Sequence, residues 1–117
     1  RKTFCLPVFF NDMAESFPDV NFIMGRCGCS YDNGTAVEIL KKHPNVYCDT
    51  SQGMDFHSKR AMKVGGINKV LLGTGTPDLN YFDLEIEKVK NGAKDFPGGE
   101  EMVLYKNAAR LFGLEVE

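Results

Sequence analysis

The sequence predicts an α/β protein built from parallel βα repeats. Three short runs rich in apolar residues lie at 20–25, 46–50 and 69–73 and have the length of strands. Amphipathic stretches separate them, and Gly, Pro, Asn or Asp residues lie at the borders. Strands that alternate with helices form right-handed crossovers and a parallel sheet. We therefore expect one domain over residues 1–117, with helices packed on the sheet.

Helices are predicted on either side of each strand. The first ends before Pro18, because a residue that precedes proline is disfavoured in the helical region. Thr35 and Glu38 have the spacing of a capping box, which predicts a helix start at Thr35. Gly65 and Gly66 are typical of a helix end. The predicted helices cover about residues 7–17, 35–42 and 54–64, a segment that contains Phe82, Ile86 and Val89, and about residues 100–112.

The composition excludes two classes of partner. The chain has 14 basic and 16 acidic residues and a formal net charge of -2, without a basic cluster, so we expect no nucleic-acid partner. Its apolar runs are far shorter than the roughly 18 residues that a membrane-spanning helix needs, so we expect no membrane partner. A chain of this type with four cysteines and a core of its own is expected to be cytoplasmic, with reduced thiols.

The cysteines and histidines allow more than one interpretation. Cys27 and Cys29, with Cys48 on the next strand, could form a soft-metal site, because thiolates bind such metals. The C-x-C spacing is a weak signal, however, and small buried thiols at strand ends are the interpretation we favour. His43 precedes a proline and His57 lies in a predicted helix, and both are expected at the surface.

Four segments, in order, carry a resemblance to a known family. They read FPDVNFIMG at 17–25, HPNVYCDTS at 43–51, NKVLLGTGTP at 68–77 and KNAARLFGL at 106–114. Together they resemble the amidohydrolase-related, metal-dependent hydrolases, and in particular the decarboxylases of the aminocarboxymuconate semialdehyde type. The resemblance implies the C-terminal half of a (β/α)8 barrel, that is, a partial TIM barrel of about three to four strands with flanking helices.

The resemblance fails at two positions that carry chemistry in the family. Arg26 stands where the family has a histidine, and arginine stays protonated, so it acts neither as a general base nor as a metal ligand. Gly75 stands where the family has a metal-binding or basic aspartate, and it has no side chain. The resemblance implies a divalent metal such as zinc in the complete barrel, with the other ligands on earlier strands. We assign no metal ligand and no catalytic residue to this chain.

The candidate ligand-binding residues follow the first and third predicted strands. Arg26 can hold a carboxylate or a phosphate. Thr74, Gly75 and Thr76 lie between a strand and a helix, where backbone N–H groups can bind an anion, although a plain βα loop is the alternative. Asp78 could partly replace the aspartate that Gly75 lacks. These residues predict a site for a small carboxylate or phosphate.

Two functions agree with these residues. The first is a hydrolase or decarboxylase domain for small carboxylated molecules, incomplete or inactive alone. The alternative is a non-catalytic remnant that binds an anion or another ligand and self-associates. A half-barrel leaves open sheet edges and an apolar face, so we expect either a homo-oligomer or a missing N-terminal half. The segment 49–51 closes the second strand, and Thr50 or Ser51 is expected to cap the next helix.

Overall fold

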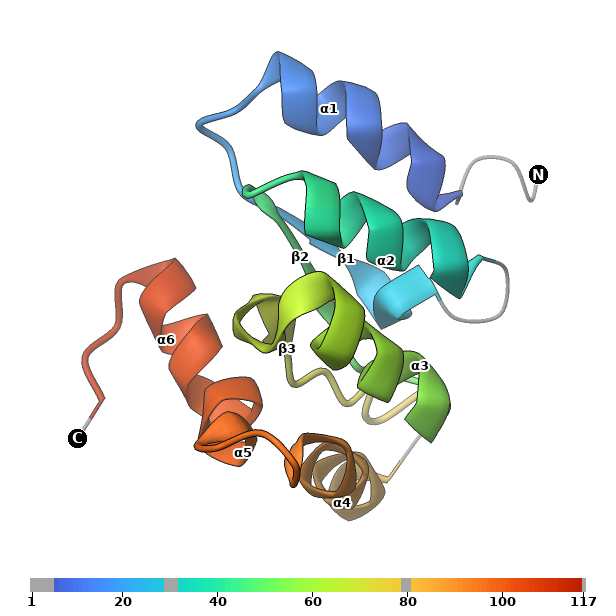
Figure 1. Ribbon diagram of the computed structural model, residues 1–117. Helices are drawn as coiled ribbons and strands as arrows, with labels where there is room; N and C mark the ends of the chain where they lie inside the picture. Colours follow the sequence, from blue (N-terminus) through green and yellow to red (C-terminus); the bar gives the residue numbers. More distant parts are fainter. Residues whose placement is uncertain (1–5, 29–31, 79–80, 117) are drawn as a thin grey trace.

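Three short parallel strands form the centre of the molecule (Figure 1). They are β1 (Phe22–Met24), β2 (Val46–Asp49) and β3 (Val70–Leu71), in the order β1-β2-β3. Met24 is level with Cys48, and Cys48 is level with Val70. The structure is a computed structural model that describes residues 6–28, 32–78 and 81–116. It confirms the predicted fold class, a parallel α/β sheet with flanking helices that is consistent with part of a barrel.

The helices follow the predicted order, and two of them contain wider π turns. Their bounds are η2 (Pro7–Phe9), α1 (Phe10–Ser16), η3 (Gly25–Gly28), α2 (Asn33–Lys42), α3 (Asp55–Arg60), η4 (Ala61–Gly66), η5 (Ile67–Lys69), α4 (Phe82–Ala93), α5 (Gly99–Glu101), η6 (Met102–Lys106) and α6 (Asn107–Phe112). The segments η4 and η6 are the π turns, which continue α3 and join α5 to α6. Among the residues that the structure describes, none of these helices is long and apolar enough to cross a membrane.

The start of α2 differs from the prediction. Asp32 is the N-cap, and its Oδ1 accepts a hydrogen bond of 3.0 Å from the Thr35 N–H. Hydrogen bonds from the Thr35 hydroxyl and N–H hold the pKa of Asp32 below its usual value. The prediction that Thr35 caps this helix is therefore wrong. The aspartate lies three residues earlier and satisfies the free N–H of Thr35 itself.

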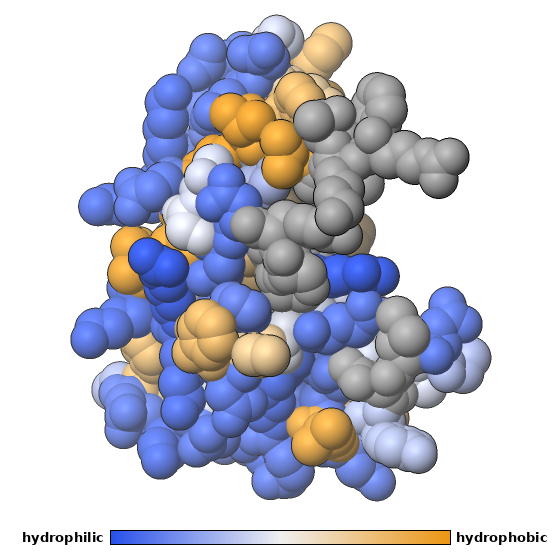
Figure 2. All heavy atoms as spheres, turned by 90° about the vertical axis from the view of Figure 1, so that its right-hand side faces the viewer, coloured by the Kyte–Doolittle hydropathy of each residue, from blue (hydrophilic) through white to orange (hydrophobic). Residues whose placement is uncertain are grey.

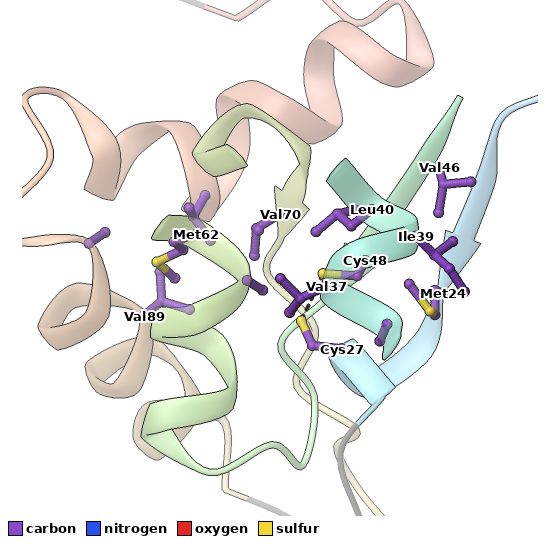
Figure 3. Packing of buried hydrophobic residues seen from close by; sticks show 14 of the residues in the cluster. Met24, Cys27, Val37, Ile39, Leu40, Val46, Cys48, Met62, Val70 and Val89 are labelled. Atoms are coloured by element: carbon purple, nitrogen blue, oxygen red, sulfur yellow. Dashed lines mark hydrogen bonds between the residues drawn. The ribbon is translucent and has the colours of Figure 1, made fainter. Parts of the chain in front are cut away.

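The core lies between the sheet and the helices α2 and α3–η4 (Figure 3). Every second strand residue points to this side, and Met24, Val46, Cys48 and Val70 are all buried there. Leu40 and Met62 from the covering helices fill the space around them, as do Val37 and Ile39. On the other side of the sheet Ile23 is 40% exposed. The helices therefore shield one face of the sheet more fully than the other.

Side chains fix the start of β2. Asn45 is buried and donates hydrogen bonds to the carbonyls of Ala14, Phe17 and Val20, at 3.2, 3.1 and 2.9 Å. One amide thus holds the end of α1 and the segment that leads into β1. His43 lies just before this strand and is buried, with its Nε2 2.8 Å from Asn11 Oδ1. The prediction that His43 is a surface residue is therefore wrong, because α1 packs over it.

The outer edges of β1 and β3 differ in their hydrogen bonds. The Leu71 carbonyl accepts from the Thr50 N–H on the β2 side, so the next residue, Leu72, directs its N–H to the opposite edge. There the Val103 carbonyl, in the π turn η6, accepts from it at 2.9 Å. Within the described residues, β1 pairs with β2 alone. Its outer edge is therefore the more open one.

Apolar side chains are exposed near β1. The predicted helix over residues 7–17 contains Phe9, Phe10 and Phe17, and of these Phe9 and Phe17 are exposed rather than packed in the core. In Figure 2 hydrophobic spheres gather in the upper part of the face, at the height at which α1 lies in Figure 1. Such a group of exposed apolar residues is typical of a contact surface. The exposed apolar residues between the start of η2 and the end of β1 are Val8, Phe9, Met13, Phe17, Val20 and Ile23.

Candidate functional site

Asp49 lies at the centre of the carboxyl ends of the strands. It is the last residue of β2, and its Oδ1 accepts hydrogen bonds from the N–H of Arg26 at 3.2 Å and of Ser51 at 2.9 Å. The Ser51 hydroxyl donates to the same oxygen. These loops lie on the right-hand side of Figure 1, the side that faces the viewer in Figure 2. Asp49 therefore joins the loop after β1 to the loop after β2.

The loop after β3 packs against the same carboxylate. A Cβ atom at Gly73 would lie 2.6 Å from Asp49 Oδ1, so only glycine leaves room for the aspartate here. The Thr50 hydroxyl is 3.3 Å from the Gly73 carbonyl and 3.2 Å from the Gly73 N–H. The expectation that Thr50 or Ser51 caps a helix is therefore wrong. Their side chains hold the strand ends together.

The turn after β1 has an unusual backbone. Arg26 and Cys27 have φ angles of 63° and 47°, in the left-handed region that costs a non-glycine residue about 1–2 kcal/mol. The turn leaves the Arg26 side chain exposed and buries Cys27. The Asn33 amide donates to the Cys27 carbonyl at 2.7 Å, which holds the turn against the start of α2. The exposed guanidinium is thus carried by a backbone that the fold keeps strained.

The predicted loop residues form a compact turn after β3. Gly75 has φ 69°, and the Gln52 side chain lies beside it. The Thr76 N–H donates to the Thr74 hydroxyl at 3.3 Å, and the Asp78 N–H donates to the Gly75 carbonyl at 3.1 Å. The turn thus uses two of its own N–H groups. The residues of this turn lie after one outer strand and Arg26 after the other, with β2 between them.

The described residues do not fit the divalent metal that the resemblance implies. Among them, no group of three or more His, Cys, Asp or Glu side chains could hold a metal ion. Gly75 supplies no side-chain ligand, and the Asp49 Oδ1 already accepts from Arg26 and Ser51. Of the cysteines considered for a soft metal, Cys29 lies outside the described residues.

A buried lysine that was not predicted from the sequence holds the loop after β2 from the side of α4. Lys88 of α4 donates to the carbonyls of Thr50 at 2.7 Å and Gly53 at 2.8 Å. It also forms an ion pair with Glu85 one turn earlier, and both side chains are more than nine-tenths buried. A signal for it was present, because an acid and a base three residues apart flank the apolar face that contains Val89. Lys88 therefore attaches α4 to the loop after β2.

His57 is expected to make the stability of the loop after β2 depend on pH. The Met54 N–H at the start of α3 donates to His57 Nδ1 at 3.2 Å, a bond that requires this nitrogen to be unprotonated. Burial, with the nearby charges of Lys88 and Arg60, lowers the pKa of His57 below its ordinary value of 6.5. A lowered pKa in the folded state means that protonation favours unfolding. The contribution of neutral His57 is complete above pH 6.5 and is lost as the pH falls through that value to the lower folded pKa.

We expect the free energy of unfolding to fall by up to about 1 kcal/mol more for the native chain than for a His57→Gln variant between about pH 7.5 and pH 5. The effect is small because His57 is partly exposed and solvent screens its charge. Urea unfolding at both pH values measures it. His43 is present in both proteins and cancels in the comparison. Equal pH dependence of the two chains would exclude a role for His57.

The segment that contains the site matches a known protein family. The family model Amidohydro_2, described as amidohydrolase, matches residues 3–114. A comparison with curated proteins finds no match. The matched segment contains all three strands and the loops that surround Asp49. The site described above is therefore part of the matched segment.

Proposed function

Since the chain belongs to the amidohydrolase family, we propose that it supplies the substrate-binding edge of a hydrolase or decarboxylase for small carboxylated molecules. The observation that supports this proposal is the position of Arg26, exposed just after β1 at the carboxyl end of the sheet. Barrel enzymes bind their substrates at this end of the strands. A guanidinium holds a carboxylate through two parallel hydrogen bonds, which orients as well as attracts it. In this proposal Arg26 is the carboxylate anchor.

Asp49 adds a preference for the rest of the substrate. Its carboxylate lies between Arg26 and Gly73 and repels a second anion at the centre of the site. A substrate with one carboxylate at Arg26 and a neutral or hydrogen-bond-donating group toward Asp49 fits this arrangement. We propose that such substrates are favoured over dianions.

The chain alone is proposed to be inactive. The described residues form a sheet of three strands, whereas a complete barrel has eight, and by the resemblance Arg26 and Gly75 stand where the family has its histidine and its aspartate. We propose that it corresponds to the C-terminal half of the barrel, within the branch that contains the aminocarboxymuconate semialdehyde decarboxylases. The exposed apolar residues near β1 suit contact with a second copy or with an N-terminal half.

A second candidate function rests on Gly75. Without a side chain at that position, the turn can bind an anion but cannot act as a base. A non-catalytic, self-associating domain that binds a carboxylate or a phosphate through Arg26, Thr74 and Thr76 agrees with this. The two functions differ in the anion that they favour.

Thermal unfolding in the presence of benzoate, inorganic phosphate or benzamide tests the proposal. We expect benzoate to raise the melting temperature and benzamide, which lacks the charge, to have no effect. The Arg26→Gln variant should bind benzoate at least about tenfold more weakly, because it loses a charge-assisted pair of hydrogen bonds. The variant Arg60→Gln, which changes an exposed arginine of α3, is the matched control.

Three other outcomes would contradict the proposal or favour a different site. Equal benzoate binding by the native chain and by Arg26→Gln would contradict the carboxylate anchor. Stabilisation by phosphate but not by benzoate would favour the non-catalytic alternative. One equivalent of zinc in the purified chain would show a metal site that the described residues do not form by themselves.

A further inference from the structure

Two buried cysteines from different elements lie with their sulfur atoms together. Cys27 belongs to the turn after β1 and Cys48 to β2, and they are 1% and 0% exposed. Their Sγ atoms are 2.8 Å apart, and Figure 3 shows them pointing toward one another. Cys27 Sγ also lies 2.9 Å from the Asp49 carbonyl oxygen. Both thiols are free in this structure.

We propose that Cys27 and Cys48 are a modification site that peroxide oxidises to a reversible disulfide. The sulfur atoms need to approach from 2.8 Å to about 2.05 Å, and no other element has to move between them. The proposal rests on these two side chains and does not depend on the proposed hydrolase function. It differs from the soft-metal interpretation, since it requires neither Cys29 nor a metal.

The chemistry balances with peroxide as the oxidant. One thiolate attacks a peroxide oxygen, forms a sulfenic acid and releases hydroxide, which takes a proton to become water. The second thiolate attacks the sulfenic sulfur, forms the S–S bond and releases the oxygen as a second hydroxide. In total, two thiols and one hydrogen peroxide give one disulfide and two waters. A dithiol reductant reverses the step by thiol–disulfide exchange.

The turn after β1 determines which sulfur reacts first. The hydrogen bond with Cys27 and complete burial raise the pKa of Cys48, so its thiolate is disfavoured in the closed fold. Cys27 lies on the strained turn in which Arg26 and Cys27 both have positive φ angles. Local opening of this turn releases the strain and exposes Cys27 without removing β2 from the sheet. Cys27 therefore takes the first oxygen, and Cys48 resolves it on closure.

The disulfide would connect the ends of two neighbouring strands. Cys27 and Cys48 are 21 residues apart, and the segment between them contains α2. The bond would close this segment into a covalent loop and hold the turn after β1 in place. It would also fix Arg26 beside Asp49, because each is the direct neighbour of one of the two cysteines. Oxidation would thus set the position of the candidate anchor residue.

The test uses the complete 117-residue chain treated with hydrogen peroxide. After treatment, free thiols are blocked with iodoacetamide under denaturing conditions, and peptides are mapped by mass spectrometry without reduction. We expect a linked peptide that joins Cys27 to Cys48, lighter than its two parts by two hydrogen atoms, which dithiothreitol removes. A Cys5→Ser/Cys29→Ser variant keeps only the proposed pair and should form the same link in similar yield.

Three results would overturn the proposal. The first is a link that joins Cys27 to Cys29 or Cys5 instead of Cys48. The second is sulfinic or sulfonic acid at Cys27 without a disulfide. The third is the absence of a link in the Cys5→Ser/Cys29→Ser variant while its circular dichroism matches that of the native chain, so that folding is retained.

Discussion

Replacement of Lys88 by methionine should lower the free energy of unfolding by about 3–5 kcal/mol. The side chain of Lys88 is 7% exposed and that of its partner Glu85 is 2% exposed. Water therefore cannot reach the Glu85 carboxylate to compensate for the lost cation. The Glu85 carboxylate would lose the charge beside it in a buried position. The carbonyls of Thr50 and Gly53 would lose a charged donor at the same time. Urea unfolding at neutral pH measures the change.

Two further variants separate the buried pair from helix effects. Lys90→Met removes the same charge from the same helix, but the Lys90–Glu87 pair is exposed, and we expect a change within about 0.5 kcal/mol. The double variant Glu85→Leu/Lys88→Met removes both charges and should recover part of the loss, because two apolar side chains can replace a buried pair. Equal destabilisation by Lys88→Met and Lys90→Met would contradict this account of the buried pair.

Replacement of Asn107 by alanine should cost about 2–4 kcal/mol of unfolding free energy. Asn107 is completely buried, and its amide donates to the carbonyls of Ile67 at 2.8 Å and Val70 at 2.9 Å. These carbonyls lie at the start of β3, where the chain leaves a helical turn and enters the sheet. Alanine leaves both without this donor and leaves a small cavity.

Asn91→Ala is the matched control for Asn107. Asn91 also donates from its amide, but it is exposed and its bond to Asp55 is long, at 3.4 Å. We expect this variant to change the unfolding free energy by less than about 0.5 kcal/mol. Both variants can be compared by urea unfolding under identical conditions. A similar loss in the two would show that the Asn107 amide does not fix the start of β3.

The positions of the strands depend on local sequence pattern and could be predicted from the sequence. Each strand lies within its predicted run of apolar residues, because buried parallel strands need side chains that suit both faces. The predictions for Thr35 and His43 were wrong for two different reasons. Asp32 and Thr35 are both residues that can cap a helix, and they lie three positions apart. A capping-box match at Thr35 does not show which of the two is the cap. His43 is buried by a contact with Asn11, 32 residues away, which no local pattern contains.

The site could be predicted only as far as strand ends could be placed. Arg26 and the turn around Gly75 follow directly from the ends of predicted strands, although their role in binding stays a prediction. The role of Asp49 could not be predicted, because its hydrogen bond to Arg26 depends on the register between β1 and β2. Lys88 reaches Thr50 from a helix 38 residues later, so its contact could not be read from spacing.

The hydrogen bond between the Leu72 N–H and the Val103 carbonyl makes the two edges of the sheet differ in how readily another strand could pair there. A new strand beside β3 would have to displace this carbonyl from the Leu72 N–H, and the π turn that supplies it would have to rewind. Addition at β1 requires no such exchange within the part of the chain that the structure describes. If a further strand pairs with this sheet, we expect it on the β1 side, because the Leu72 N–H at the β3 edge already has an acceptor.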